Sequence, residues 1–379
     1  MSPTASAQAV LDRTARLAGE LRERELDALL IETPVNVRYV TGFTGSNALA
    51  VLFAVDGDGE DGFGAGQHRF LTDFRYATQS GVQVPQAFER EIVTGELLDA
   101  VGRSLPGARG RLGFDEASVS VARHRRLSEL LGEAWQLVPF PGAVERLRAV
   151  KEPAEIELIR AACDLADEAL EKVLEGGLAG RSERDVAIEL ELRMRRLGAE
   201  AASFAPIVAA GSHGALPHAQ PTGEAIPRDV LVTIDWGALH EGYCSDCTRT
   251  FATGEAISEE AREVYALVLR SQEQGLAALR AGPSGRDVDA VARAVIDQGG
   301  HGEQFGHGLG HGVGMEVHEA PRLSRTAGEQ PLQAGNVVSV EPGVYLPDGL
   351  GVRIEDLAVV EEGGCTVLTG LPKSLTVVS

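Results

Sequence analysis

The stretch of the chain best equipped for chemistry is residues 305–321, which read FGHGLGHGVGMEVHEAP. His307 and His311 are four residues apart, His318 follows seven later, and five glycines are interleaved with them. Imidazoles bind metals and carry protons, and glycine lets the backbone pack closely around a site. The alternative is a glycine-rich loop with incidental histidines. The choice depends on whether carboxylates elsewhere in the chain complete a site.

A first pair of carboxylates lies in residues 230–251, VLVTIDWGALHEGYCSDCTRTF, which predict an antiparallel hairpin. If His240 and Glu241 form the turn, Asp235 lies directly opposite Asp246, with Cβ atoms roughly 4.5–5.5 Å apart. Carboxylates this close repel each other unless cations lie between them. Two metal ions roughly 3.5–4 Å apart would fit. Two acids facing solvent are the alternative, but Asp235 ends an apolar run typical of a buried strand.

A second pair, Glu341 and Glu355, lies in residues 337–360, VVSVEPGVYLPDGLGVRIEDLAVV. Each glutamate ends or interrupts an apolar, strand-like run, where an acid is costly unless it is paired, hydrogen-bonded or metal-bound. Arg353 precedes Glu355 by two residues, so on a strand both side chains point to the same face. A structural ion pair is the alternative interpretation for these two residues alone.

Together these residues form a candidate metal-binding set. It consists of Asp235, Asp246, His311, Glu341 and Glu355. A set rich in oxygen with one imidazole suits Mn²⁺, Co²⁺, Fe²⁺ or Zn²⁺ better than a thiolate site would. His218, in the loop sequence FAPIVAAGSHGALPH, would by itself be read as a surface residue.

The chain length of 379 residues favours two domains, with the boundary placed after residue 142. Residues 1–142 predict an α/β domain with a mixed sheet, because helical and strand-like segments alternate. A helix is expected over 8–26, strands over 27–32, 49–55 and 69–72, a turn-rich segment over 36–47 and a flexible hairpin tip over 56–68.

Residues 143–379 contain an internal echo: AGRSERDV at 179–186 resembles AGPSGRDV at 281–288. Ser182 and Ser284 are expected to cap the starts of two helices. Two helices that merely share a good cap are the alternative. The pattern favours two related α+β halves folded into one domain, with a site between them.

Composition excludes several classes of protein. A formal net charge of −21 argues against a nucleic-acid partner, which requires a basic surface. Four cysteines are too few for a disulfide scaffold, and Cys244 and Cys247 are read as small strand residues, with a redox pair as the alternative. The sequence has no apolar signal core and no apolar run of membrane-spanning length, so a cytoplasmic protein without membrane partners is expected.

Four segments together resemble the pita-bread metallopeptidases, which include methionine aminopeptidases, Xaa-Pro aminopeptidases and prolidases. The matching pieces are LPHA around His218, DWG…YCSDCTRTF, FGHGLGHGVGMEVHEAP and SVEPGVYLPDGLGVRIED. NVRYVTGFTGSNA and LTDFRYATQS are similar to the N-terminal domain of the proline-specific branch. The resemblance therefore implies an α+β chain with a creatinase-like N-terminal α/β domain and a C-terminal pita-bread catalytic domain that contains a pseudo-twofold repeat.

Carried over residue by residue, the resemblance implies a site for two divalent metal ions, Mn²⁺ first, with Co²⁺, Zn²⁺ or Fe²⁺ as alternatives. Asp246 and Glu355 would bridge the ions, Asp235 would bind one, and His311 with Glu341 would bind the other. Glu341 would also be the general acid and base. The substrate-binding and proton-shuttling residues would be His218, His307 and His318, and Arg353 would support the ligands.

The implied activity is hydrolysis of the amide bond before a proline in the second position of a dipeptide or short peptide. A hydroxide shared by both metal ions would attack the carbonyl carbon. Leu309 looks more like a prolidase residue, so an Xaa-Pro dipeptidase is favoured and an Xaa-Pro aminopeptidase is the alternative. A metal-free creatinase-like C–N hydrolase and a non-catalytic peptide-binding module are disfavoured because all five ligands are present. A homodimer is implied by the family.

Overall fold

The computed structural model describes residues 7–54, 68–105, 109–347 and 349–379. The chain divides into two compact units, residues 1–148 and 149–379, rather than after residue 142. The difference is helix α6 (Ala143–Ala149), most of which belongs to the first unit. Asn36 donates to Glu145 Oε1 (2.6 Å) and accepts from Arg148 Nη1 (2.7 Å). These bonds tie α6 to the first unit.

The first unit is built on a mixed sheet with strand order β4-β3-β2-β1-β5-β6. Its strands are β1 (Ala28–Ile31), β2 (Ala48–Phe53), β3 (His68–Asp73), β4 (Phe88–Val93), β5 (Gly110–Phe114) and β6 (Trp135–Pro139). Its other helices are α1 (Ala7–Glu23), α2 (Pro34–Thr41), η1 (Phe74–Tyr76), α3 (Ala77–Gln83), α4 (Leu97–Ser104) and α5 (Val121–Leu131). Strand β1 is antiparallel to β2 and parallel to β5, so the expectation of a mixed sheet is confirmed.

One segment of the first unit differs from its prediction, and another lies almost entirely outside the described residues. The segment predicted as turn-rich begins with helix α2, because Pro34 fits the first helical turn and Val37 and Val40 are buried against the core. Gly42, with φ of 75°, ends that helix. The hairpin tip expected at 56–68 lies outside the described residues, except for His68, which opens β3.

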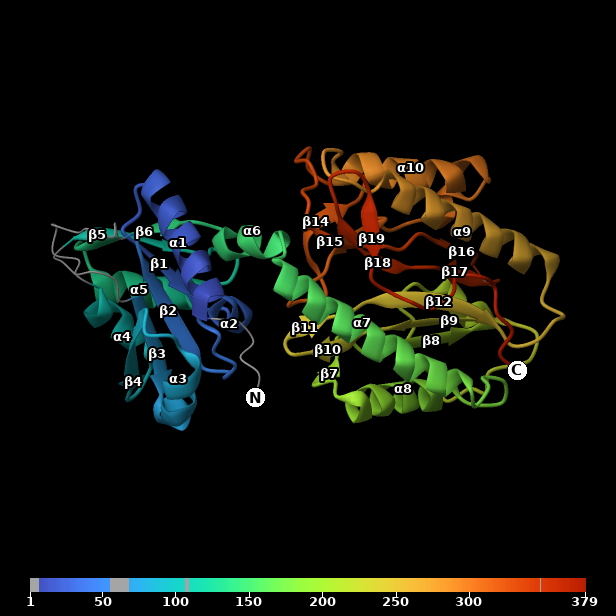
Figure 1. Ribbon diagram of the computed structural model, residues 1–379, viewed down its shortest axis with the longest axis horizontal. Coiled ribbons are helices and arrows are strands. Elements are labelled where there is room, and N and C mark those ends of the chain that lie inside the picture. The colour runs from blue at the N-terminus through green and yellow to red at the C-terminus, as the bar shows by residue number, and fades with distance from the viewer. Residues whose placement is uncertain (1–6, 55–67, 106–108, 348) are drawn as a thin grey trace. The chain divides into compact units, whose positions relative to one another are not determined.

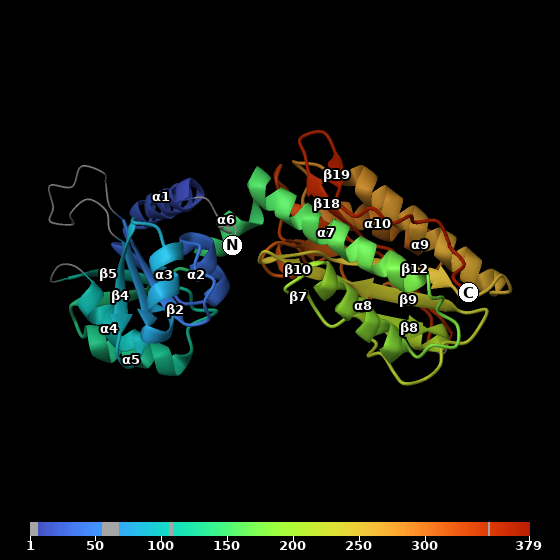
Figure 2. The same cartoon turned by 60° about the horizontal axis from the view of Figure 1, so that its bottom comes forward.

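The second unit contains two long helix pairs. They are α7 (Pro153–Leu174) with α8 (Glu183–Leu197), and α9 (Glu259–Ala278) with α10 (Gly285–Gln298). Figure 1 shows α9 and α10 on one side of the strands and α8 on the other, and Figure 2 shows α9 beside α10 from a second direction. Among the described helices, none is long and apolar enough to cross a membrane.

The predicted caps of α8 and α10 are confirmed. Ser182 Oγ accepts from the amide of Asp185 (3.0 Å), and Ser284 Oγ accepts from the amide of Asp287 (3.2 Å). Asp287 Oδ2 in turn accepts from the amide of Ser284 (2.9 Å), which completes a capping box. The two segments that echo each other in sequence therefore start equivalent helices in the two halves of the unit.

The strands of the second unit form four small sheets with short 3₁₀ turns between them. The strands are β7 (Ala201–Ala202), β8 (Ile207–Ala210), β9 (Leu231–Trp236), β10 (Ala238–His240), β11 (Tyr243–Cys244), β12 (Cys247–Ala252), β13 (Gly310–Gly312), β14 (Glu319–Leu323), β15 (Val337–Val340), β16 (Gly343–Tyr345), β17 (Gly351–Arg353), β18 (Asp356–Val360) and β19 (Cys365–Val367). The turns are η2 (Gly211–Ala215) and η3 (Gly302–Gln304). The sheet orders are β12-β9-β8, β11-β10-β7, β14-β13-β15-β18-β19 and β16-β17. In the first half, α7 and α8 pack against the strands through one apolar core. In the second half, α9 and α10 pack against the strands through another.

The predicted register of the 230–251 hairpin is wrong by two residues. Asp235 pairs with Thr248, not with Asp246. The turn is at Glu241 and Gly242, whose φ angles are 46° and 83°, because this tight turn needs positive φ at both positions and glycine supplies the second at no cost. A shift of two residues keeps every side chain on its face of the sheet, since the side-chain period of a strand is two. Asp246 therefore lies diagonal to Asp235 on the same face.

Candidate metal centre

Three acids from three different strand ends meet in the second unit. Asp235 lies near the end of β9, Asp246 directly before β12, and Glu355 between β17 and β18. Each offers a carboxylate oxygen, and these oxygens lie within 4.8 Å of one another. Asp246 and Glu355 are buried. The sheets of the two halves thus bring together acids that are up to 120 residues apart in the sequence.

The other two predicted ligands lie beside this cluster. His311, on β13, has its Nε2 3.2 Å from Glu341 Oε1 and 3.7 Å from Asp246 Oδ2. Ser339 Oγ donates to Glu341 Oε1 (3.1 Å) and accepts from the amide of His311 (3.0 Å). All five residues predicted as metal ligands therefore lie in one place.

The imidazole of His311 is oriented for metal binding. Its Nδ1 lies 3.1 Å from the carbonyl oxygen of Gly312, so Nδ1 carries the proton and donates it there. The lone pair of a neutral ring is then on Nε2, which faces Glu341 and Asp246. A hydrogen bond from the remote ring nitrogen to a carbonyl is the usual way to fix the tautomer of a metal-binding histidine.

The electrostatics of the cluster call for cations. Burial, reinforced by the neighbouring acids, raises the pKa of Asp246 and of Glu355 well above the usual range. Burial also raises the pKa of Asp235, although Arg353 opposes it. Asp235 Oδ1 and Glu355 Oε1 are buried and have no hydrogen-bond donor. Unpaired carboxylate oxygens at this density match the ligand chemistry of divalent cations, so the donor set fits a metal centre.

Glu341 behaves differently from the other acids. Burial disfavours its ionised form, but the hydrogen bond and charge of His311, with His307 and Arg353 nearby, outweigh burial and lower its pKa to about 2. The same contact with Glu341 raises the pKa of His311 against the opposing effect of burial. Glu341 is therefore held ionised at neutral pH, as a proton acceptor must be.

Arg353 connects the acids to a tyrosine that the sequence analysis missed. Arg353 Nη2 donates to Asp235 Oδ2 (2.8 Å) and Nη1 donates to Tyr345 Oη (2.9 Å). Tyr345 Oη also lies 2.9 Å from His307 Nε2. A continuous chain thus runs from His307 through Tyr345 and Arg353 to Asp235. Tyr345 stood in the same apolar run as Glu341, but nothing in its spacing distinguished it from a core aromatic.

The predicted histidines divide into two kinds. His307 is largely enclosed, with Nδ1 2.8 Å from the carbonyl oxygen of Gly308 and Nε2 on Tyr345. His318 is exposed, and its ring centroid lies 4.4 Å from that of His311. Partial burial of the ring, then the charge of His311, lower the pKa of His318 against the opposing effect of Glu341. His218 is also exposed and directly follows Pro217, whose carbonyl oxygen accepts from Arg353 Nη1 (3.2 Å).

A positively charged residue near the cluster, Arg322, was also not predicted from the sequence. Arg322, on β14, pairs with His311 on β13, and directly paired residues of antiparallel strands share a face. Arg322 is exposed and close enough to His318 to lower its pKa. Its position four residues after His318 was the available signal, but only the strand register shows that it lies on the same face as His311.

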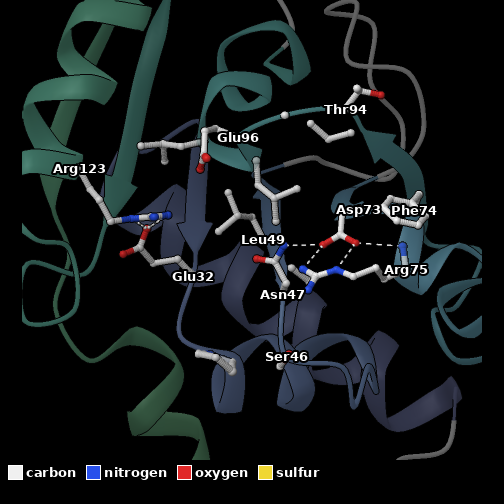
Figure 3. Close-up of a pocket in the computed structure, with 16 residues that line it drawn as sticks. Glu32, Ser46, Asn47, Leu49, Asp73, Phe74, Arg75, Thr94, Glu96 and Arg123 are labelled. Atoms are coloured by element: carbon white, nitrogen blue, oxygen red, sulfur yellow. Dashed lines mark hydrogen bonds and ion pairs between the residues drawn. The ribbon is translucent and has the colours of Figure 1, made fainter.

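The first unit has a polar cavity of its own, of about 680 Å³, at the carboxyl ends of β1, β3 and β4. Figure 3 shows that Asp73 points toward Asn47 and Arg75, and that Glu32 meets Arg123. These carboxylates are satisfied by amide and guanidinium donors. They differ in this respect from Asp235 and Glu355 of the second unit, each of which has one buried carboxylate oxygen without a donor.

The fold and the site together define a two-domain metallopeptidase. Residues 157–362 match the metallopeptidase family M24, and residues 13–150 match the creatinase/prolidase N-terminal domain. The chain belongs to the metallopeptidase family M24, and this family description implies a divalent metal ion. The expected family, fold class and enzyme class are confirmed.

Similar proteins cover almost the whole chain. An uncharacterised peptidase, YqhT of Bacillus subtilis, is 40% identical over 368 residues, which are 97% of this chain and 99% of that protein. The Xaa-Pro dipeptidase of Pyrococcus furiosus is 33% identical over 364 residues, 96% of this chain and 99% of that protein. The relationship therefore extends through both units.

Solved structures give the same result. The chain matches an Xaa-Pro dipeptidase from Bacillus anthracis with a TM-score of 0.90 and 36% identity, covering 97% of this chain and 99% of the other. It matches an X-Pro aminopeptidase from Thermotoga maritima with a TM-score of 0.86 and 36% identity, covering 97% and 100%. These structures agree on the fold, and their names divide between the two activities expected from the sequence.

Proposed function

We propose that this protein is an Xaa-Pro dipeptidase with two divalent metal ions. The observation that carries the proposal is the group of four carboxylates and one imidazole, buried or half-buried, in which two carboxylate oxygens have no donor. The named dipeptidase of Pyrococcus furiosus and the dipeptidase structure from Bacillus anthracis support the substrate class. We assign catalysis to the second unit, and substrate access and subunit pairing to the first.

The metal ions would be held by the five clustered residues. Asp235, Asp246 and Glu355 would supply carboxylate oxygens to the ions, and His311 with Glu341 would complete the ligand set. When bound, the ions would acidify a water molecule and polarise the substrate carbonyl. Mn²⁺ suits this oxygen-rich set best, with Co²⁺, Zn²⁺ or Fe²⁺ as alternatives.

Glu341 is the proposed general base and acid. The contact with protonated His311 lowers the pKa of Glu341, and a bound metal ion would favour the ionised carboxylate in the same way, so Glu341 can take a proton from water. It then delivers that proton to the imino nitrogen of the leaving proline. Ser339 fixes the direction of the carboxylate through its 3.1 Å hydrogen bond to Oε1.

The exposed histidines are the proposed substrate contacts. His318 has a lowered pKa and is therefore neutral at pH 7, so it can donate one ring N–H to the substrate carbonyl oxygen. His218 lies on the loop that Arg353 holds through Pro217. His307 uses both ring nitrogens within the protein, so we assign it a positioning role through Tyr345 and Arg353 rather than direct substrate contact.

Arg322 favours a dipeptidase over an aminopeptidase. A dipeptide substrate ends in a free carboxylate directly after proline, whereas a longer peptide continues as neutral backbone. Arg322 shares a face with His311 and is exposed, which suits a cation that captures that carboxylate. The Xaa-Pro aminopeptidase remains the second candidate, because the Thermotoga maritima structure is equally similar in sequence.

The test uses purified protein stripped with a chelator and reloaded with Mn²⁺. Turnover of Xaa-Pro dipeptides, with much slower turnover of Xaa-Pro-Yaa tripeptides, is expected. Faster cleavage of the tripeptides would replace the dipeptidase assignment by the aminopeptidase. Full activity in the continued presence of chelator would remove the metal from the mechanism. Light scattering on the same sample tests the expected homodimer.

A further inference from the structure

A buried ion pair on α10 lies outside the proposed metal and substrate contacts. Arg293 donates from Nε to Asp289 Oδ2 (2.9 Å) and from Nη2 to Asp289 Oδ1 (2.8 Å). The Asp289 side chain is fully buried and that of Arg293 is 8% exposed. Because desolvating two charges is costly, a buried pair needs further hydrogen bonds to be tolerated.

The further hydrogen bonds of Asp289 and Arg293 all go to the histidine-rich segment, residues 305–321. Arg293 Nη1 donates to the carbonyl oxygen of Phe305 (2.8 Å), and Nη2 donates to that of His307 (2.8 Å). The guanidinium carbon lies 4.0 Å from the centre of the Phe305 ring. Asp289 Oδ1 accepts from the amide of Leu309 (3.0 Å). The pair thus fixes three alternate residues of a segment that is otherwise rich in glycine.

These contacts extend to Glu341 through one residue, Leu309. The carbonyl oxygen of Leu309 accepts from the amide of Glu341 (2.8 Å). Leu309 is therefore held by Asp289 on one side and holds Glu341 on the other. The same pair sets the place of His307, whose ring leads through Tyr345 to Arg353.

We propose that Asp289 and Arg293 are positioning residues for the reaction: they fix the backbone from which His307 and Glu341 act. The inference rests on the proposed function of Glu341 and His307. A forked guanidinium can bind two carbonyl oxygens and a carboxylate at once, which an ammonium cannot do. An apolar pair of similar volume would pack without the desolvation cost, but it would leave the carbonyl oxygens of residues 305 and 307 without donors.

The first test is a double-mutant cycle on Mn²⁺-loaded enzyme. Arg293→Lys keeps the charge but loses the fork, and kcat is expected to fall roughly 10- to 100-fold with little change in KM. In a His307→Gln background the same substitution should lower kcat by a smaller factor, because only the positioning of Glu341 is then left to lose. Equal losses in both backgrounds would contradict positioning through His307.

The second test needs no metal, substrate or turnover. Hydrogen exchange in the metal-free protein is followed in peptides covering residues 305–311 and 339–343. Asp289→Asn and Arg293→Lys are expected to speed exchange there roughly 5-fold or more. Val288→Ala is the matched control, since Val288 is the preceding residue of α10 and is 1% exposed in the apolar core. It should lower the unfolding midpoint without selective exchange in these peptides.

The outcomes separate this inference from the proposed function. If the parent enzyme does not cleave Xaa-Pro peptides but exchange rises selectively, the pair positions this segment and the proposed function is wrong. If the parent enzyme is active and both ion-pair variants match Val288→Ala in exchange and in kcat, the pair is structural only and the inference is overturned. Asp289→Asn retains an acceptor for the Leu309 amide, so a folded variant is available if Arg293→Lys fails to fold.

Discussion

The guanidinium of Arg353 lies with Nη2 2.8 Å from Asp235 Oδ2. The same group donates from Nε to Thr248 Oγ1 (3.0 Å), and Thr248 Oγ1 donates to Glu355 Oε2 (2.8 Å). Arg353 therefore orients one proposed metal ligand directly and a second through a hydroxyl. It also leaves Asp235 Oδ1 and Glu355 Oε1 unpaired and available to cations. The buried guanidinium of Arg353 thus both orients the acids and reduces the repulsion between them.

The first prediction concerns Arg353→Lys. An ammonium cannot reach Asp235, Tyr345 and Thr248 together, so the acids lose their fixed orientation. Mn²⁺ affinity, measured by titration calorimetry, is expected to fall roughly 10- to 100-fold, and kcat with it. Arg280→Lys, at an exposed position, is the control. Unchanged metal affinity in Arg353→Lys would show that the arginine does not support the ligands.

The second prediction concerns Glu341→Gln. The amide keeps an oxygen for the hydrogen bond from Ser339 but cannot accept the proton of water. Turnover is expected to fall by roughly 10²- to 10⁴-fold, with the unfolding midpoint little changed. Glu329→Gln, at a side chain that is 90% exposed, should behave as the parent enzyme does. Retained turnover in Glu341→Gln would remove Glu341 from its proposed role.

The acids of the site could be predicted from the sequence because charge in an apolar strand is conspicuous. Asp235 and Asp246 were expected to be neighbours, and they are, although the register that led to this expectation was wrong. The prediction survived because the error was two residues, which preserves the face of the sheet. A one-residue error would have placed one of the two acids on the opposite face.

Other parts of the site could not be predicted, because they depend on contacts between distant segments. Tyr345 reads as a core aromatic until β16 pairs with β17, which brings its hydroxyl between Arg353 and His307. The role of Asp289 is hidden for the same reason, since an acid four residues before an arginine on a helix is usually a surface pair. In the first unit, helix α2 was missed because its sequence is rich in β-branched residues, and burial of its apolar face outweighs that local preference.

The third prediction tests substrate choice through Arg322→Leu. If Arg322 captures the carboxylate of a dipeptide, kcat/KM for Xaa-Pro should fall about 10-fold or more, equivalent to about 1.4 kcal/mol, mainly through KM. Cleavage of Xaa-Pro-Yaa should change little, because that substrate has no carboxylate at this point. Arg325→Leu removes an equivalent exposed charge three residues further on and serves as the control. Equal losses on both substrates would argue against carboxylate capture.

The fourth prediction concerns removal of the metal. Stripping with a chelator should abolish turnover and lower the unfolding midpoint, because Asp235, Asp246 and Glu355 then face one another without a metal ion between them. Asp246→Asn removes from this cluster one carboxyl group whose ionised form burial and the neighbouring acids disfavour. It should raise the midpoint of the stripped protein, by roughly 2–4 °C for each kcal/mol gained, and abolish stabilisation by Mn²⁺. Calorimetric scans with and without Mn²⁺ compare the two proteins, and a midpoint of stripped Asp246→Asn below that of the stripped parent would contradict the argument.

The fifth prediction concerns pH and the first unit, where His68 is buried in β3. Its Nδ1 accepts from the amide of Phe53 (3.2 Å), and its ring lies against Phe88. Burial lowers the pKa of His68 from 6.5 to about 4. Between pH 4 and 6.5 the unfolded chain therefore binds more protons at this residue than the folded chain does. The stability that His68 contributes is present above pH 6.5 and is lost as the pH falls toward 4.

The pKa shift of His68 sets the size of this loss in the free energy of unfolding, which is about 3 kcal/mol at pH 4. His68→Asn places an amide oxygen near the position of Nδ1, so it can accept from Phe53 without titrating. Urea unfolding from pH 4 to 7.5 should show a steep decline for the parent protein below pH 6.5 and a shallower one for His68→Asn. His124→Asn, at an exposed position in α5, should follow the parent curve. If His68→Asn also follows the parent curve, the burial of His68 does not cause the loss of stability at low pH. Other titrating groups must then cause it.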